Sequence, residues 1–324
     1  MAKVLVTGGA GFIGSNVCAL FKQAGYEVTA FDNLYLGRES NLEEGVKFIK
    51  GDINSDEDLA KLPENYDYIV HLAAASSAPM FESNLVQSCE TNMIASIKIF
   101  ELARKTGVKK VIFASTSSIY GDNIPPLRED QPVSPPNIYA VTKHNMEEIA
   151  KVYSDLYDLE IIAFRFMSIY GVHEEHKGKF ANLVSQFLWT MYQGKAPVVF
   201  GDGTQTRDFT NAIDVARGIK LACEKDKKYG FTVFNIGSDV NYSVRDLVDI
   251  INKSLGTNIE ARFIPNPLRW TATNQLGDLT KIRTELDYEP SIDLETGLAA
   301  LVKDLPSDPN LLPDVSHIEE ILKK

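Results

Sequence analysis

The first half of the chain alternates short apolar runs with longer amphipathic stretches. The short runs are rich in β-branched residues and predict strands, whereas apolar positions three or four residues apart predict helices. The predicted strands are Val4–Val6, Glu27–Phe31, Val46–Lys50, Tyr68–Leu72, Val111–Ala114 and Ile161–Arg165, and the main helices are Phe12–Gln23, Asn84–Arg104 and Tyr139–Tyr157. Strands that alternate with helices are typical of an α/β fold with a doubly wound parallel sheet.

The regularity falls after Arg165, which indicates a second and smaller α/β domain. Helical patterns recur near Asn182–Tyr192 and at Ser243–Leu255 and Leu279–Leu286, and a helix followed by a strand lies between them at 212–236. A chain of 324 residues also exceeds the size that one core usually serves. We predict a parallel-sheet domain at 1–165 plus 212–238, a second domain at 166–211 plus 239–305, and a tail at 306–324. The tail has one apolar-periodic stretch, His317–Leu322, which predicts a helix that is either docked or mobile.

Composition narrows the class of protein. Apolar residues make up 44% of the chain and charged residues 24%, as in an ordinary globular protein. The net charge of −11 argues against nucleic acid or an anionic membrane as a partner, because clustered Lys and Arg bind both. No apolar run is long enough for a transmembrane helix, and the chain enters a strand at once, so we expect a cytoplasmic protein. Cys18, Cys89 and Cys223 lack metal-ligand spacing, and we expect no metal site.

A glycine-rich turn joins the first predicted strand to the first helix. Gly8, Gly11 and Gly14 form this turn, and Asp32 ends the next strand. Such a turn presents backbone N–H groups to a pyrophosphate, and a Cβ at Gly8 or Gly11 would crowd that anion. The Asp32 carboxylate can accept hydrogen bonds from an adenosine ribose, which favours NAD over NADP, although Arg38 nearby leaves some room for a phosphate.

Small and polar side chains follow the later strands, at the edge where a parallel sheet binds its ligand. Leu72, Ala73 and Ala74 follow the fourth strand, and Ser115–Ser118 follow the fifth. The alanines allow a flat cofactor to approach, and close packing of the chain explains them equally well. No carboxylate or metal ligand is visible near His71 in the sequence, so we predict a hydrogen-bonded core histidine there.

The candidate chemistry lies on the helix that begins near residue 139. Tyr139 and Lys143 are four residues apart, and this spacing places them on one face of a helix. Positive charge from Lys143 and from an oxidised nicotinamide favours the phenolate and lowers the pKa of the phenol. A phenolate can take a proton from a sugar or alcohol hydroxyl while hydride leaves the carbon, and Thr116 can bond the same oxygen.

These motifs resemble the extended short-chain dehydrogenase/reductase superfamily, and within it the nucleotide-sugar epimerases and dehydratases. The resemblance rests on the glycine turn, on His71–Ala74, on Ser115–Gly121 and on Tyr139 with Lys143. It implies NAD as the cofactor, bound by Gly8, Gly11, Phe12, Ile13, Gly14, Asp32, Asn33, Asp52, Ile53, Leu72, Ala73, Ala74, Asn92, Tyr139 and Lys143. It also implies a nucleotide-sugar substrate bound by Ser76, Thr116, Ser168, Asn182 and Arg207, with Arg207 on the diphosphate. A surface ion pair of Arg207 with Asp202 or Asp208 is the alternative.

The resemblance also indicates the reaction. Family dehydratases and decarboxylases carry acidic residues directly after the Ser/Thr, where this chain has Ser117 and Ser118. We therefore expect a 4-epimerase of the UDP-glucose/UDP-galactose type, in which hydride leaves the sugar and returns to it while NAD stays bound. A reductase, a dehydratase and a non-catalytic NAD(H)-sensing scaffold are the alternatives.

One loop complicates this choice. His176-Lys177-Gly178 resembles a segment of ADP-heptose 6-epimerases, in which the matching lysine is a second acid/base. Lys177 is thus a candidate catalytic residue, and a loop lysine near phosphate or solvent is the competing interpretation. The family also implies a homodimer, paired through the helices near 84–104 and 139–157.

Overall fold

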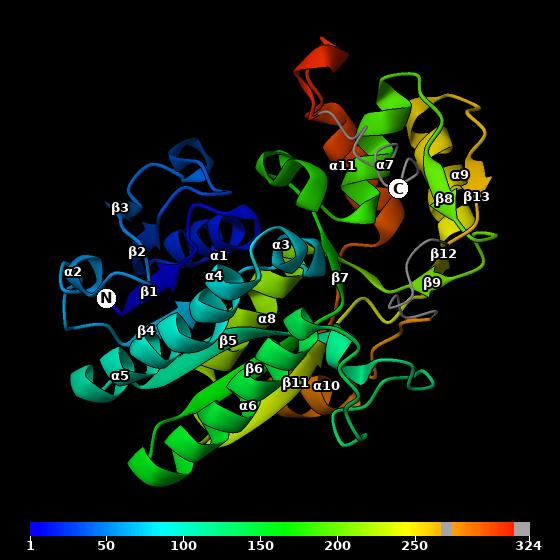
Figure 1. Cartoon of the computed structure of the whole chain (residues 1–324). Coiled ribbons are helices and arrows are strands. Elements are labelled where there is room, and N and C mark those ends of the chain that lie inside the picture. Colours follow the sequence, from blue (N-terminus) through cyan, green and yellow to red (C-terminus); the bar gives the residue numbers. More distant parts are fainter. Residues whose placement is uncertain (267–273, 314–324) are drawn as a thin grey trace.

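A seven-stranded parallel sheet forms the centre of the protein (Figure 1), seen in a computed structural model that describes residues 1–266 and 274–313. The strand order is β3-β2-β1-β4-β5-β6-β11. Every neighbouring pair is parallel, which confirms the predicted fold class. The strands are β1 Lys3–Thr7, β2 Glu27–Asp32, β3 Lys47–Lys50, β4 Tyr68–His71, β5 Lys110–Thr116, β6 Ile161–Phe166 and β11 Phe231–Ile236. The order reverses between β1 and β4, and a sheet of this kind binds its ligand outside the carboxyl ends of the strands there.

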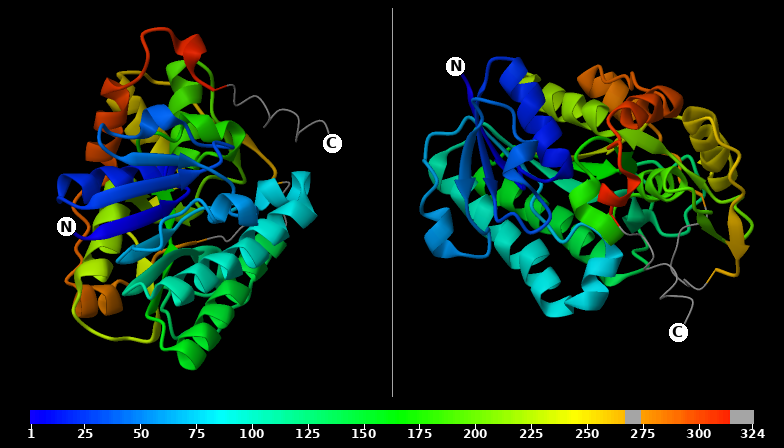
Figure 2. Two further views of the ribbon diagram at one scale, coloured as in Figure 1. Left: turned by 90° about the vertical axis from the view of Figure 1, so that its left-hand side faces the viewer. Right: turned by 90° about the horizontal axis from the view of Figure 1, so that it is seen from above.

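Helices cover both faces of this sheet (Figure 2). Helices α1 (Phe12–Gln23), α8 (Ala212–Glu224) and α10 (Thr280–Leu286) lie on one face, and α5 (Ser96–Thr106) and α6 (Ile138–Tyr157) lie on the other. Side chains alternate between the faces: Val4 and Val6 pack under α1, whereas Leu5 packs on the opposite side. Strands buried on both faces explain the continuous apolar runs in the sequence.

The predicted helix Asn84–Arg104 is broken into several pieces. Shorter helices, α3 (Ala78–Ser83) and α4 (Leu85–Cys89), are followed by a π-helical turn at Glu90–Ala95, and α5 begins only at Ser96. The π-helical turn contains Asn92, whose side chain bonds to residues outside the helix. Single-turn π-bulges are frequent at functional sites, and a periodicity pattern does not reveal them.

A smaller α/β region lies beyond the carboxyl edge of the sheet (Figures 1 and 2). Its core is formed by α7 (Leu183–Tyr192), α9 (Val244–Leu255) and α11 (Leu294–Lys303). Its short strands pair as β7 (Ser168–Tyr170) with β10 (Phe209–Asn211), β8 (Val198–Phe200) with β13 (Arg262–Ile264), and β9 (Thr206–Arg207) with β12 (Tyr242–Ser243). The sequence did not predict α11. Its Gly297 allows close packing, because a Cβ there would lie 2.1 Å from the Tyr170 hydroxyl.

The two regions interleave along the chain. Helix α10 packs against β11 and α8 in the core of the large sheet, although α9 and α11 on either side of it belong to the smaller region. The exact domain limits stay a prediction. The shorter elements are α2 (Asp56–Leu59) and the 3-10 turns Glu39–Asn41, Ser117–Tyr120, Glu175–Phe180 and Pro309–Leu311.

The start of the tail docks on α7. The Tyr192 hydroxyl donates to the Pro306 carbonyl at 2.9 Å, and Leu312 is buried beside Trp189. The predicted helix His317–Leu322 lies outside the described residues. Within residues 1–266 and 274–313, no helix is long and apolar enough to cross a membrane, and no group of three His, Cys, Asp or Glu side chains could hold a metal ion.

Candidate active site

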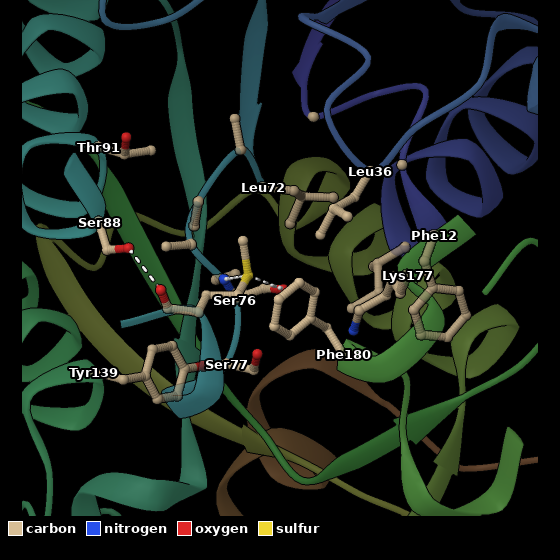
Figure 3. Close-up of a pocket in the computed structure, with 18 of the residues that line it drawn as sticks. Phe12, Leu36, Leu72, Ser76, Ser77, Ser88, Thr91, Tyr139, Lys177 and Phe180 are labelled. Carbon is tan, nitrogen blue, oxygen red and sulfur yellow. Dashed lines mark hydrogen bonds between the residues drawn. The ribbon is translucent and has the colours of Figure 1, made fainter. Parts of the chain in front are cut away.

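A pocket of about 970 Å³ opens at the carboxyl ends of the central strands, between the sheet and the smaller region. Its walls include the ends of β1, β2, β4 and β5 together with Arg207 and the segment that precedes α7. Every site residue predicted from the sequence lines this pocket except Asn92. Predicted site residues from Gly8 to Arg207 therefore meet in one place, and Figure 3 shows several of them.

The glycine turn forms the floor of the pocket. Gly8 has φ +70°, and a Cβ there would lie 2.8 Å from the backbone nitrogen of Ala73. A Cβ on Gly14 would lie 2.0 Å from the Gly8 carbonyl oxygen, so α1 can approach the turn only with glycine at this position. The nearest atom to a Cβ on Gly11 is the Gly8 oxygen, at 3.2 Å. The sequence analysis predicted that a Cβ at Gly8 would crowd the pyrophosphate. In the structure, such a Cβ would instead crowd the protein's own backbone at Ala73.

This turn fits a dinucleotide. Gly11 is the N-cap of α1 and has no side chain to cap the helix, and the next two residues, Phe12 and Ile13, line the pocket. The first N–H groups of a helix have no partner within the helix, and the helix dipole makes them a favourable site for a phosphate group. The pocket thus offers a pyrophosphate both backbone donors and space.

Two acidic residues lie beyond the turn. The Asp32 carboxylate accepts hydrogen bonds from the backbone nitrogens of Ala10 at 3.1 Å and Leu34 at 2.7 Å. Burial raises the pKa of Asp32, and these backbone donors oppose the shift. Asp52, after β3, accepts a hydrogen bond from the Asn33 side chain at 3.1 Å. A carboxylate held in this way can accept hydrogen bonds from a ribose diol.

Asn92 supports the pocket wall from behind. It is 1% exposed, and its side chain bonds both the backbone N–H and the carbonyl of Ala75, at 2.8 and 3.1 Å. Its amide also donates to the Thr142 hydroxyl on α6 at 3.1 Å. Asn92 therefore fixes the loop that carries the cofactor-side alanines to the helix that carries Tyr139.

His71 is a structural residue, as predicted. Its ring is buried between the Thr7 hydroxyl at 2.7 Å and the Ser96 hydroxyl at 2.8 Å. Burial, followed by the charge of Lys143, lowers the pKa of His71 to about 3. The ring is consequently neutral at physiological pH.

Thr116, Tyr139 and Lys143 meet at the end of β5. Thr116 is the last residue of the strand, and its oxygen accepts a hydrogen bond from the backbone of Ser118 at 3.2 Å. Lys143 is buried, and its Nζ donates to the Ala114 carbonyl at 2.9 Å. Both α6 residues face the same strand end because they are one helical turn apart.

The pKa values of this group differ from the sequence prediction. Burial raises the pKa of the Tyr139 phenol, and the Thr116 side chain acts in the opposite direction. Burial also lowers the pKa of Lys143 to about 8. The protein alone therefore does not bring the pKa of the phenol down toward neutral pH, because the cost of burying a phenolate outweighs the Thr116 hydrogen bond. The sequence analysis attributed a lowering of the phenol pKa to two positive charges, those of Lys143 and of the oxidised nicotinamide. The second of these charges is present only when the cofactor is bound.

The smaller region contributes polar groups to the opposite side of the pocket. Arg207 is half-buried, and its guanidinium donates to the Thr206 carbonyl at 2.8 Å. Asn182 caps α7, accepting a hydrogen bond from Val184 N at 3.1 Å, as its predicted place at a helix start implies. Ser168, at the start of β7, also lines the pocket.

Lys177 is tied to a buried carboxylate that the sequence analysis did not identify. Its Nζ lies 3.6 Å from an oxygen of Glu174, whose side chain is 1% exposed. Glu174 also accepts hydrogen bonds from Asn182 N at 2.7 Å and from the Ser185 hydroxyl at 2.6 Å. The Lys177 ammonium lies 5.6 Å from the centre of the Phe12 ring, beside the first residue of α1. Figure 3 shows Lys177 and Tyr139 on opposite sides of the pocket, with Phe180 between them.

Sequence reasoning also missed several pocket residues. Ser77 lines the pocket, and among the described residues its buried hydroxyl oxygen has no hydrogen-bond partner. Phe180, Leu36 and Met80 add an apolar patch that packs with Tyr139. These residues lie in loops and short helices without a motif. Only the position of Ser77 beside the predicted Ser76 was a usable signal.

The glycine turn, the acid after β2 and the Thr–Tyr–Lys group define an enzyme of the short-chain dehydrogenase/reductase class. The sequence model of the NAD dependent epimerase/dehydratase family matches residues 4–237. The chain belongs to this family, and its cofactor is NAD.

Similar proteins agree with this assignment. A UDP-glucuronate 4-epimerase from Thermodesulfobacterium geofontis is 32% identical over 93% of this chain and 95% of its own length. The crystal structure of UDP-glucose 4-epimerase with UDP-glucose from Thermotoga maritima has a TM-score of 0.86 at 32% identity, covering 93% of this chain and 97% of that one. The ADP-L-glycero-D-manno-heptose-6-epimerase of Helicobacter pylori has a TM-score of 0.83 at 30% identity, covering 94% and 96%.

Proposed function

We propose that the protein is a nucleoside-diphosphate-sugar 4-epimerase of the UDP-glucose/UDP-galactose type. One observation carries the proposal. Among the described residues that line the pocket, the carboxylates are Asp32 and Asp52, which follow β2 and β3 at the far end of the sheet from Tyr139. Among the described residues that line the pocket, no acidic side chain is therefore available next to Thr116 and Tyr139 for an elimination or a decarboxylation. The remaining chemistry is the removal and return of one hydrogen at one carbon.

Tyr139 acts as the acid and base in this proposal. Its phenolate takes the proton of the sugar C4 hydroxyl, and its phenol returns a proton to that oxygen when the ketone is reduced again. Thr116 bonds the same oxygen and fixes its position. The buried Lys143 ammonium stabilises the phenolate by its charge. Bound NAD supplies the acceptor, and later the donor, of the hydride at C4.

The polar groups of the smaller region suit the diphosphate of the substrate. The Arg207 guanidinium can bind two phosphate oxygens at once, and Asn182 lies at the N-terminus of α7, where the helix dipole favours an anion. Holding the diphosphate there leaves the hexose between Tyr139 and Lys177. The choice of UDP is supported by the substrates named for the similar proteins.

A 6-epimerase with two bases is the second candidate. It is favoured by Lys177, which lines the same pocket opposite Tyr139, and by the similarity to the heptose 6-epimerase. The ion pair with Glu174 weighs against it, because it gives Lys177 a structural partner within the protein.

We further propose a homodimer and a cytoplasmic location. Exposed apolar residues follow one face of α6, among them Ile138, Val141, Val152 and Leu156, and Ile94 lies on the neighbouring π-helical turn. An exposed apolar stripe on adjacent helices is a typical protein–protein interface. The three free cysteines are compatible with a reducing compartment.

Incubation of the purified protein with UDP-glucose tests the function. We expect proton NMR to show conversion to UDP-galactose without addition of NAD and without net formation of NADH. The matched control is Tyr157→Phe, at the exposed end of the same helix as Tyr139, which should turn over like the parent. No conversion of UDP-glucose, together with inversion of an ADP-heptose at C6, would establish the second candidate instead.

A further inference from the structure

Glu147 lies one helical turn beyond Lys143 on the same face of α6. Tyr139, Lys143 and Glu147 are spaced by four residues, and a lysine and a glutamate at this spacing commonly form an ion pair on a helix. In this protein the two groups bind other partners. Lys143 Nζ donates to the Ala114 carbonyl, and the ion pair of Glu147 is with Arg165.

Arg165 holds Glu147 in a bidentate pair. Its Nε lies 3.0 Å from one carboxylate oxygen of Glu147 and its Nη2 lies 2.7 Å from the other. The two side chains are 6% and 3% exposed. Two parallel hydrogen bonds of this kind fix orientation as well as charge.

The pair is anchored to the strands that carry the site. Arg165 is the register partner of Ser115 in the β5–β6 pairing, and the Ser115 hydroxyl donates to Glu147. Arg165 also donates to the Tyr120 hydroxyl at 2.9 Å. Ser115 stands between Ala114, which binds Lys143, and Thr116. The pair therefore neutralises Glu147 directly beside the catalytic group.

Few charges face Lys143 from the surrounding elements. On α6 the ionisable neighbours of Lys143 are Tyr139 and Glu147. The Glu147 charge is neutralised by Arg165 on β6. From β4 comes His71, which is neutral because its pKa is lowered to about 3. Among the described residues, the Lys143 ammonium is thus buried with no net negative charge beside it. This agrees with the lowering of its pKa to about 8 by burial.

We propose that Arg165 is a positioning residue that keeps the Glu147 carboxylate away from Lys143, so that the whole ammonium charge acts on the Tyr139 phenol. The inference rests on the proposed function only in taking Tyr139 as the acid and base. Without the Arg165 charge, Glu147 turns to Lys143. A carboxylate at that place disfavours the phenolate and favours the ammonium, which raises the pKa of both groups.

The test compares Arg165→Met, Glu147→Gln and the double variant. Two quantities are followed in the NAD-loaded protein. The first is the pH dependence of epimerisation. The second is the ultraviolet absorbance of the Tyr139 phenolate as a function of pH, obtained as the difference from the same protein that also carries Tyr139→Phe. We expect Arg165→Met to move both curves to higher pH by about one unit, a tenfold change in the proton equilibrium. Glu147→Gln leaves the Arg165 charge unpaired and should move them to lower pH. The double variant should return close to the parent.

Uniform loss of activity with unchanged midpoints would overturn the proposal, and so would a double variant that shifts as far as Arg165→Met. If Arg165→Met does not fold, the shift of Glu147→Gln decides alone, since a merely structural pair predicts none. Arg104→Met, which breaks the more exposed pair with Glu101 on α5, is the control and should shift nothing. If the parent protein inverts no nucleotide sugar, the proposed function fails, while the absorbance titration still measures the role of Arg165.

Discussion

Replacing Lys177 by alanine separates the two candidate functions. Lys177 lines the pocket opposite Tyr139 and lies 3.6 Å from the buried Glu174 carboxylate. In a 4-epimerase that uses Tyr139 alone as acid and base, Lys177 only helps to bind the substrate and to hold its loop in place. We therefore expect turnover of UDP-glucose to fall by no more than about tenfold, which corresponds to a loss of ~1.4 kcal/mol of binding free energy. In an enzyme that needs Lys177 as its second acid/base, the loss should be about 10²–10⁴-fold.

The same variant has a pH-dependent effect on stability. Burial raises the pKa of Glu174, and the Lys177 charge opposes this, so the pKa rises further once Lys177 is gone. A carboxyl whose pKa is higher in the folded than in the unfolded protein binds more protons when folded, and the free energy of unfolding then falls as pH rises. Two hydrogen bonds to Glu174 remain, from Asn182 and Ser185. We expect a loss of about 1–3 kcal/mol at neutral pH, which diminishes in acid.

The assay combines NMR turnover with urea unfolding at acid and neutral pH. Lys179→Ala is the matched control, because Lys179 is exposed and carries the same charge two residues away. A Lys177→Ala protein that remains folded and binds NAD but loses about a thousandfold in the conversion of UDP-glucose would refute the one-base mechanism. Equal stability losses at both pH values would refute the account of Glu174.

Three further predictions concern the pocket. Tyr139→Phe should lower turnover by about 10²–10⁴-fold while NAD content after purification stays at the parental level; near-parental turnover would remove Tyr139 from its role. Gly14→Ala places a Cβ 2.0 Å from the Gly8 carbonyl oxygen, so it should abolish NAD retention and lower the melting temperature, and a variant that retains NAD would contradict the close approach. If the buried Ser77 hydroxyl binds the sugar, Ser77→Ala should raise KM or lower kcat for UDP-glucose by about five- to tenfold. Ser254→Ala on α9 is the control, and unchanged kinetics of Ser77→Ala would exclude the contact.

Local patterns predicted the elements that depend on local interactions. Helix α1 begins and ends at the predicted residues, Phe12 and Gln23, because the glycine turn precedes it and Gly25 follows it. Strand ends were also well placed, since parallel strands buried on both faces appear as continuous apolar runs. The residues that follow these strands, such as Asp32 and Thr116, could therefore be assigned to one pocket.

Contacts between distant segments explain what the sequence did not predict. The π-helical turn forms where Asn92 bonds Ala75 and Thr142, and nothing in the local periodicity marks it. Burial, rather than the charge of Lys143, sets the direction of the Tyr139 pKa shift. Spacing in a sequence indicates which groups can meet, but not how far water is excluded from them.

The most direct test of the central claim follows the hydrogen at C4 of the sugar. UDP-glucose carrying deuterium at C4 is converted in ordinary water, and the UDP-galactose formed is analysed by NMR and mass spectrometry. If hydride leaves and returns through bound NAD while Tyr139 moves only the hydroxyl proton, the deuterium stays at C4 of the product. Replacement of this deuterium by solvent hydrogen, or its appearance on another carbon, would contradict the mechanism.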